Sequence, residues 1–426
     1  MGNKKKVIII GAGTAGITIA NNIQNYFNVD VIEKSKNKKY PLIYKIPLFI
    51  GLIFRDEKTK YISIRNITLS DGRQIPFFQS NLWGGASIMN GCVHMFGSES
   101  QWKSILKTFK SSYGELLESY DSLYSSDQKN INKITLTLSS QNIIDKAFIK
   151  SLNQQNIPVG DVDFSNTEAC GPILNTVKKY FRTSVLSLIR KKGYNNSLGE
   201  VVENILFDNK GQVTGVKTNL RTINSDYVIL SGGVIGTYEI LLRTKEKNKG
   251  KGKDNFNNFV LGEDLQDHTN LRINVITNKN IGSLNEISNS FFKKLLLFFK
   301  HCAGQSTLLR GTGATSAANL DLDQDGIIDT RIQIVQFTET GRHNIGGKLF
   351  SDEPGFSLSI TTIYPQSKGR ITGEGTSSVI DPMYLSSKKD VELLKLALKY
   401  CLNLLQSQPL SDHILKIEVI GLQALQ

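Results

Sequence analysis

The hydrophobic pattern of the chain begins with a short β-branched run, Lys6–Ile10 (KVIII), which is typical of a strand buried on both faces. Glycine-rich residues 11–16 (GAGTAG) follow, and the next segment, ITIANNIQNYF, has the period of a helix. A second run, VDVIEK, predicts another strand with Glu33 at its end. The order strand, glycine turn, helix, strand and acid predicts the βαβ unit of a dinucleotide-binding domain.

Each part of this unit has a physical role. Gly11 makes the tight turn, Gly13 lets the backbone approach a pyrophosphate, and Gly16 lets helix and strand pack closely. The helix N-terminus directs its N–H groups and its positive dipole end at the phosphates, while Glu33 accepts hydrogen bonds from the adenosine ribose. The predicted cofactor contacts of the unit are Gly11, Gly13, Thr14, Ala15, Gly16 and Glu33. This motif alone does not distinguish FAD from NAD.

A second glycine-rich stretch, residues 82–97 (LWGGASIMNGCVHMFG), places adjacent glycines, a serine and an asparagine among large apolar residues. Strand and helix interiors avoid this mixture, and glycine is favoured where a backbone approaches another group closely. The stretch therefore predicts a loop with a ligand against it. A tight core turn without a ligand is the alternative.

Further along the chain, TRIQIVQF and SLSITTIYP alternate apolar and polar residues, which predicts half-buried strands. SFFKKLLLFFKH, residues 290–301, has the pattern of a short basic amphipathic helix. We expect this helix to pack on the fold, and a helix lying on a lipid surface is the alternative. No segment has the apolar length of a membrane span and no secretory signal begins the chain, so an intracellular, cytoplasmic location is expected.

Composition and charge limit the function only coarsely. Apolar content of 39% and charged content of 21% over 426 residues predict a folded protein of about two domains. The net charge is +13, with lysine clusters at Lys4–Lys6, Lys34–Lys39 and after Thr244. These clusters are expected to be solvated loops, although contact with nucleic acid or another polyanion stays open. The four cysteines are widely spaced, which favours a reducing compartment over a disulfide framework.

Several blocks together resemble the glucose–methanol–choline (GMC) family of FAD-dependent oxidoreductases. Besides GAGTAG, Gly84–Gly91 (GGASIMNG) is similar to the family's GGSSxxNG signature, and 262–268 (GEDLQDH) to its GENLQDH block. The segment from Ser367, SKGRITGEGTSSVIDPMYLSSKKDVELL, resembles the strand leading to DPxYLSDPxD, and weaker matches begin at Phe181 and Asp329. The resemblance implies an α/β fold: a Rossmann-type FAD-binding domain with an inserted α+β substrate domain on an antiparallel sheet.

The resemblance also implies where the cofactor and the domains lie. FAD is expected to be held non-covalently, since Met89 stands where choline oxidases carry a flavin-linked histidine. Residues 1–112, 180–270 and 377–426 would form the FAD-binding domain, and 113–179 and 271–376 the substrate domain. Loop 302–320 would border the flavin. The further cofactor contacts that the resemblance implies are Gly85, Ala86, Ser87, Asn90, Gly91 and Val202.

Catalytic residues are harder to assign from this sequence. Family members continue past the DPxYLS helix to a catalytic histidine with a histidine or asparagine partner, whereas this chain stops at Gln426. We therefore expect a C-terminally truncated member, inactive or weakly active on an unknown alcohol, and no catalytic residue is assigned. The alternative function is a non-catalytic structural or polyanion-contacting protein that retains the fold.

One acidic segment has the spacing of a metal loop. Residues 321–329 (DLDQDGIID) place oxygen ligands at positions 1, 3, 5 and 9 of a calcium loop and glycine at position 6, but position 12 is Ile332. Without the bidentate carboxylate, an acidic turn is the favoured interpretation, and no metal site is assigned.

Overall fold

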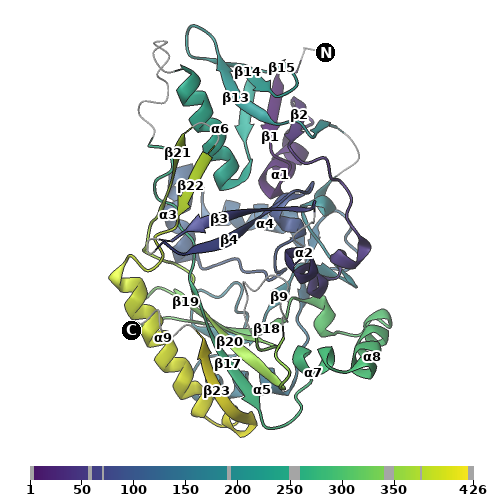
Figure 1. Ribbon diagram of the computed structural model, residues 1–426, viewed down its shortest axis with the longest axis vertical. Helices are drawn as coiled ribbons and strands as arrows, with labels where there is room; N and C mark the ends of the chain where they lie inside the picture. Colours follow the sequence, from purple (N-terminus) through teal and green to yellow (C-terminus); the bar gives the residue numbers. More distant parts are fainter. Residues whose placement is uncertain are drawn as a thin grey trace.

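Two sheets of different kinds organise the chain in the computed structural model, which describes residues 4–55, 60–69, 72–189, 193–248, 260–339, 350–374 and 377–420. The first is parallel, in the order β12 (Asn195–Leu198), β2 (Asn28–Glu33), β1 (Lys6–Ile10) and β16 (Tyr227–Leu230) (Figure 1). In β1, Val7 and Ile9 pack under α1 (Thr14–Ile23), while Ile8 and Ile10 pack towards β13 (Val202–Phe207). The run KVIII is therefore buried on both faces, as its pattern predicts.

The second sheet is antiparallel and has six strands. Their order is β23 (Ile414–Ile420), β17 (Asn270–Thr277), β20 (Gly355–Thr362), β19 (Thr330–Val335), β18 (Ala314–Leu320) and β8 (Ala169–Pro172). The helices α5 (Ile143–Gln154) and α9 (Lys388–Gln406) cover one face, which is apolar. This mixture of one parallel and one large antiparallel sheet confirms the predicted α/β fold class.

The opposite face of the antiparallel sheet is polar although it is buried. Because side chains alternate along a strand, Ile273 of β17 lies in the helix-covered core and Arg272 points to the other side. The same alternation places Ser357 and Ser359 of β20, and Arg331 and Gln333 of β19, opposite the core. A sheet face that is both buried and polar is unusual, so it is the candidate side of the sheet for a functional site.

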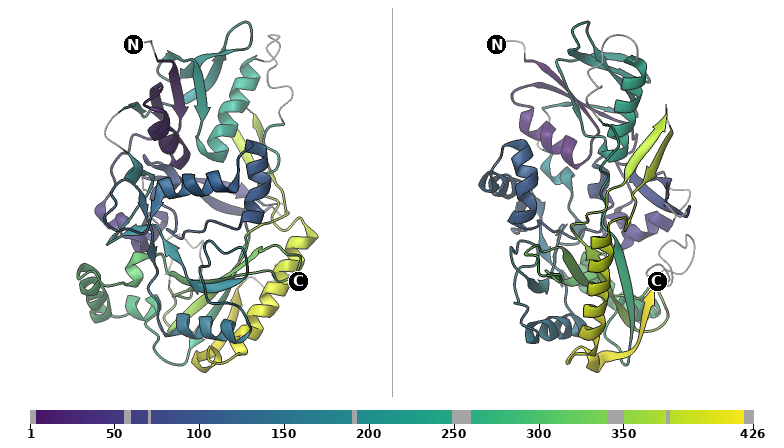
Figure 2. Two further views of the ribbon diagram at one scale, coloured as in Figure 1. Left: turned by 180° about the vertical axis from the view of Figure 1, so that it is seen from behind. Right: turned by 90° about the vertical axis from the view of Figure 1, so that its left-hand side faces the viewer.

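The remaining elements surround these sheets (Figures 1 and 2). The other helices are η1 (Leu42–Lys45), η2 (Pro47–Ile50), α2 (Gly51–Arg55), η3 (Gly85–Ile88), α3 (Glu99–Phe109), α4 (Tyr113–Leu123), η4 (Val185–Leu188), α6 (Gly233–Asn248), α7 (Leu284–Ser288), α8 (Phe291–Cys302), η5 (Leu308–Arg310) and η6 (Ser411–His413). The other strands are β3 (Ile62–Thr68), β4 (Gln74–Ser80), β5 (Tyr124–Ser125), β6 (Ile134–Thr135), β7 (Thr137–Leu138), β9 (Leu174–Asn175), β10 (Val177–Lys178), β11 (Phe181–Arg182), β14 (Val213–Thr218), β15 (Thr222–Asn224), β21 (Arg370–Glu374) and β22 (Ser377–Asp381).

The C-terminal segment differs from the predicted division. Residues 377–426 were assigned to the first domain, but β23 pairs with β17 and the apolar side of α9 packs on the antiparallel sheet. In the hairpin β21–β22, Ile371 and Ile380 pack against Tyr238 of α6; this is the reverse case for β21, which was assigned to the second domain, whereas β22 packs on the domain to which it was assigned. The boundary fails here because a helix with an apolar residue every third or fourth position packs equally well on either sheet, and the sequence does not say which.

The basic helix α8 also differs from expectation. Of its twelve residues only His301 is buried, so the prediction that its apolar side packs on the fold is wrong. Among the described residues, none of the helices combines the length and the apolarity that crossing a bilayer requires.

Candidate functional site

The first glycine loop has the geometry that its motif predicts. Gly11 adopts φ +100°, and a Cβ on Gly16 would lie 2.0 Å from the carbonyl oxygen of Gly11, so neither position accepts a side chain. A Cβ on Gly13 would meet nothing within 4 Å. Gly13 precedes α1 without a side-chain cap, which leaves the first N–H groups of the helix available to an anion at the exposed Thr14 and Ala15.

Glu33 ends β2 directly beside this loop. Its two carboxylate oxygens accept hydrogen bonds from the N–H groups of Ala12 at 2.8 Å and Ser35 at 2.9 Å, and the side chain is buried. Glu33 thus fixes the first glycine loop in position. Each carboxylate oxygen can accept a further bond, so the predicted ribose contact is compatible with this arrangement and stays a prediction.

The second glycine loop packs directly on the first, although the residues in contact are 72 positions apart in the sequence. The N–H of Gly84 donates to the carbonyl oxygen of Ala12 at 2.8 Å. Gly85 adopts φ +58°, and a Cβ there would lie 2.8 Å from Cα of Gly13. The two backbones come this close only because Gly85 carries no side chain, so this contact requires glycine at position 85.

The polar residues of the second loop are held within it. The Ser87 hydroxyl donates to the carbonyl oxygen of Gly84 at 2.7 Å, and Arg182 donates to the carbonyl oxygen of Asn90 at 3.1 Å. Thr312 donates to the carbonyl oxygen of Gly91 at 2.8 Å, so the loop 302–320 reaches this stretch. Ala86, Asn90 and Gly91 remain exposed. The surface next to the loop contact is therefore open to a long ligand.

Val202, which the resemblance adds to the predicted cofactor contacts, starts β13 on the far side of β2. Its side chain is buried in the core with Ile8 and Ile32, and its carbonyl oxygen accepts a bond from Arg243 at 3.2 Å. The side chain cannot touch a ligand in this position, so a contact would have to come from its backbone.

A cavity of about 390 Å³ lies between the second glycine loop and the polar face of the antiparallel sheet. One wall comes from η2, α2 and the loop, a second from β17, β18, β19 and the segments that follow. The lining residues are Leu48, Ile50, Gly51, Phe54, Met89, Gly91, Val93, Arg272, Thr312, Ala314, Gln333, Val335, Phe337, Glu339 and Phe350. The cavity opens beside the residues predicted to face the flavin and can hold a small organic molecule.

An ion pair is part of this cavity. Nη1 of Arg272 lies 3.0 Å from Oε1 of Glu339, with both side chains largely buried, and the guanidinium lies over the ring of Phe337. Neither residue was predicted from the sequence. Arg272 stands between the apolar Leu271 and Ile273 of β17, and Glu339 follows shortly after β19; charged residues in such places are the signal that a buried charge pair leaves.

None of the four described histidines lines the cavity; His343 lies outside the described residues. His94 lies among the rings of Tyr120, Tyr124 and Phe164, and its Nε2 is 2.9 Å from the Tyr120 hydroxyl. Burial, with a smaller contribution from the Arg331 charge, lowers the pKa of His94 to about 4. It is therefore neutral near pH 7 and serves the packing between the glycine loop and the sheet.

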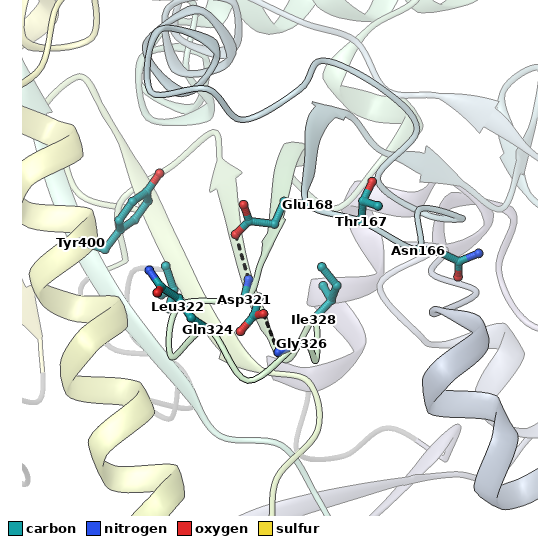
Figure 3. A pocket seen from close by; sticks show the side chains of 9 residues that line it. All are labelled: Asn166, Thr167, Glu168, Asp321, Leu322, Gln324, Gly326, Ile328 and Tyr400. Carbon is teal, nitrogen blue, oxygen red and sulfur yellow. Dashed lines mark hydrogen bonds between the residues drawn. The ribbon is translucent and has the colours of Figure 1, made fainter.

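The acidic segment forms a separate pocket of about 540 Å³ between α9 and the loop after β18 (Figure 3). Asp321 accepts bonds from the N–H groups of Asp325 and Gly326, as in a structural turn. Carboxylate oxygens of Asp321, Asp323 and Asp325 lie within 4.8 Å of one another, and Lys389 pairs with Asp325 at 2.5 Å. One ammonium group thus already offsets part of the negative charge of the cluster.

Comparison with known proteins extends over nearly the whole chain. No family model matches the sequence. Alcohol dehydrogenase [acceptor] of Pseudomonas putida is 22% identical, over 97% of this chain and 80% of that protein. Pyridoxine 4-oxidase from Mesorbium loti superposes with a TM-score of 0.77 at 15% identity, covering 98% of this chain and 83% of the oxidase.

Two further solved structures have the same fold. A formate oxidase superposes with a TM-score of 0.80 at 13% identity, covering 99% of this chain and 84% of the other. A fungal aryl-alcohol oxidase gives 0.67 at 14% identity, with 99% and 85% covered. The structural similarities establish the fold, and the sequence relative and the motif blocks in their order agree with it. The chain therefore has the fold of these oxidases and resembles the glucose–methanol–choline family of oxidoreductases.

Proposed function

We propose that this protein binds FAD non-covalently across its two glycine loops and oxidises the CH–OH group of a small alcohol held in the cavity beside Met89 and Gly91. The proposal rests on the contact between the loops: the N–H of Gly84 bonds to the carbonyl oxygen of Ala12, and Gly85 lies against Gly13. The relatives named for alcohol substrates support the reaction class.

The residues present fit such a cofactor. Gly13 offers open space at the uncapped start of α1, where the helix dipole and free N–H groups favour a pyrophosphate. Glu33 is placed for the adenosine ribose, and the exposed Ala86 and Asn90 for the flavin end. Met89 lines the cavity and forms no covalent bond to a flavin, so we expect the cofactor to dissociate in denaturant.

The cavity residues orient the substrate and exclude water. Phe54, Phe337 and Phe350 supply apolar surface, while Arg272 and Glu339 supply one hydrogen-bonding pair. FAD, when bound, supplies the acceptor for the hydride that leaves the carbinol carbon. The hydroxyl proton needs a base, and Glu339 is the one carboxylate among the described lining residues. Glu339 is already paired with Arg272, and we expect slow turnover.

Flavin binding and turnover are tested separately. The purified protein, stripped and titrated with FAD, should quench flavin fluorescence with saturation at one FAD per chain. Anaerobic addition of small primary alcohols to the loaded protein should then bleach the flavin absorbance slowly. Saturable binding without bleaching for any alcohol tested would remove the reaction and leave the cofactor site.

A matched pair of glycine variants makes the binding test specific. Gly13→Val places a branched side chain in the open space next to α1, and we expect the Kd for FAD to rise by at least about tenfold. Gly160→Val is the control, because a Cβ there also meets nothing within 4 Å and the N–H of Gly160 bonds to Cys170, outside the contact between the loops. Equal affinity for FAD in the two variants would contradict the proposed seat.

A further inference from the structure

The helix α8 is an amphipathic helix whose apolar side is on the outside of the molecule. Phe291, Phe292 and Phe299 are 72%, 80% and 60% exposed, and Leu295, Leu296 and Phe298 are exposed as well. Monomeric proteins rarely expose so many large apolar side chains next to one another, so an exposed patch of this kind marks an interaction surface.

The direction of the patch follows from helix geometry. At 100° per residue, the six exposed apolar side chains occupy an arc of about 160°, and Leu297 and His301 lie on the opposite side. Those two are the least exposed of the helix; His301 contacts Thr307 and the ring of Tyr180. The helix is thus attached by its polar side and presents its apolar side to the surroundings.

Positive charge borders the apolar arc on both sides. Lys294 lies at one edge, and Lys293 and Lys300 lie towards the other. Lys293 pairs with the buried Glu286 at 3.3 Å, whereas Lys294 and Lys300 form no ion pair within the described part of the chain. The helix itself contains no acidic residue. Lysine stems can lie along an apolar layer while their ammonium groups stay at its polar boundary.

A second exposed apolar segment lies at the same edge of the molecule. Leu42, Ile43 and Leu52 are 61%, 45% and 47% exposed, on η1 and α2. The connecting η2 packs against η5, which follows α8 closely in the chain. Figures 1 and 2 show these segments at one side of the molecule, with α8 projecting outward. The apolar surface therefore continues beyond one helix.

We propose that α8 docks this protein on the surface of an anionic lipid bilayer, with the Phe and Leu side chains in the headgroup–acyl boundary. A wide apolar arc, a lysine border and a body attached to the polar side are what an interfacial helix requires. A second copy of the chain fits less well, because a two-fold contact through this narrow helix would bring Lys294 and Lys300 towards their own copies. Anionic lipid headgroups complement the positive charge of the lysines that border the apolar arc.

Sedimentation with vesicles of phosphatidylcholine, with and without about a third of phosphatidylserine, tests this on the full chain. We expect binding to the mixed vesicles that weakens with salt, as exposed electrostatic contacts do. Phe292→Glu combined with Phe299→Glu should reduce the partition coefficient at least about tenfold, because two apolar anchors become anions at an anionic surface. Replacing Lys293, Lys294 and Lys300 by Gln should reduce binding to the mixed vesicles by a similar factor.

The helix α3 offers matched controls for both variants. Phe109→Glu changes a phenylalanine that is 74% exposed, and replacing Lys103, Lys107 and Lys110 by Gln removes the same charge from α3. Neither control should change the partition. Failure of the unaltered protein to bind mixed vesicles at low salt would overturn the proposal. So would equal losses in the α3 controls, or a dimer in the absence of lipid that Phe292→Glu dissociates, which would assign the surface to a second copy.

Discussion

The contact between the two glycine loops and the cavity beside it differ in the atoms that form them: backbone atoms form the contact, and side chains form the cavity wall. The loop contact consists of backbone: Gly84 bonds to Ala12, and Gly85 lies against Gly13. The cavity wall consists of side chains from strands far apart in the chain, among them Arg272 and Glu339. The loop contact leaves no room for a Cβ on Gly85, whereas a side-chain wall can change its chemistry without changing its architecture.

The two regions therefore fix different parts of the function. If the cofactor binds at the loop contact, the contact has to keep the same structure whatever the substrate is. The cofactor needs a close approach to the backbone and free N–H groups. The polar face of the antiparallel sheet can carry any set of side chains that remains satisfied, so substrate preference is fixed there. Substitutions and changes of pH can test each region and the boundary between them.

The largest effect is expected on the sheet side, at the buried pair of Asp163 and Arg331. Their side chains are almost fully buried, with Oδ1 of Asp163 3.3 Å from Nη2 of Arg331. Asp163→Ala leaves the guanidinium charge buried without its partner, and we expect the free energy of unfolding to fall by about 3–5 kcal/mol. Urea denaturation measures this. Asp163→Leu combined with Arg331→Met should recover most of the loss, and a single-variant loss below about 1 kcal/mol would contradict the prediction.

In the first glycine loop, the same substitution at two glycines of one motif should change the stability by different amounts. Gly16→Ala brings a Cβ to 2.0 Å from a backbone oxygen, and we expect a loss of about 2–3 kcal/mol in the cofactor-free protein. Gly13→Ala meets open space, so its stability should stay within about 0.5 kcal/mol of the unaltered protein. Thermal unfolding without FAD measures both. Equal destabilisation by the two variants would mean that Gly13 has a structural role and is not reserved for a ligand.

The same contrast explains what the sequence could predict. The βαβ unit and the second loop were recognisable because local glycine spacing encodes them, and the two motifs do meet. Arg272, Glu339 and the side of the sheet that α9 covers were not predicted, because each depends on which strands become neighbours. The exposure of α8 was predicted wrongly for a related reason: an amphipathic pattern gives the direction of the apolar side but not what lies against it.

The boundary between the two regions is probed by pH. His94 has a pKa of about 4 in the folded chain, against 6.5 for an ordinary histidine, because burial and the Arg331 charge disfavour its cation while Asp161 opposes this weakly. The unfolded chain therefore binds more protons between pH 6.5 and 4, and stability is lost as the pH falls through this window. At pH 5 the loss from this residue is about 2 kcal/mol relative to pH 7.

A difference measurement isolates His94 from other groups that titrate nearby. Burial raises the pKa of Asp163 and of Asp329 to about 6, and these carboxyls change the stability in the opposite direction over part of the same range. His94→Phe keeps an aromatic ring among Tyr120 and Phe164 and removes the titration. Urea denaturation of both proteins at pH 7 and pH 5 should show a smaller pH dependence for the variant; an unchanged dependence would contradict the assignment.

The smallest effect is expected within the cavity wall, between Arg272 and Glu339. Arg272→Met and Glu339→Gln each break the pair, whereas the double variant removes both charges from the same partly buried place. A double-mutant cycle in urea should give a coupling energy of about 1 kcal/mol, because solvent in the cavity screens the pair more than the core screens Asp163 and Arg331. The loops should not respond, so the Kd for FAD is expected to change less than about twofold in all three variants. A larger change in FAD affinity would mean that the pair acts on the cofactor, and would place the cavity and the seat in one energetic unit.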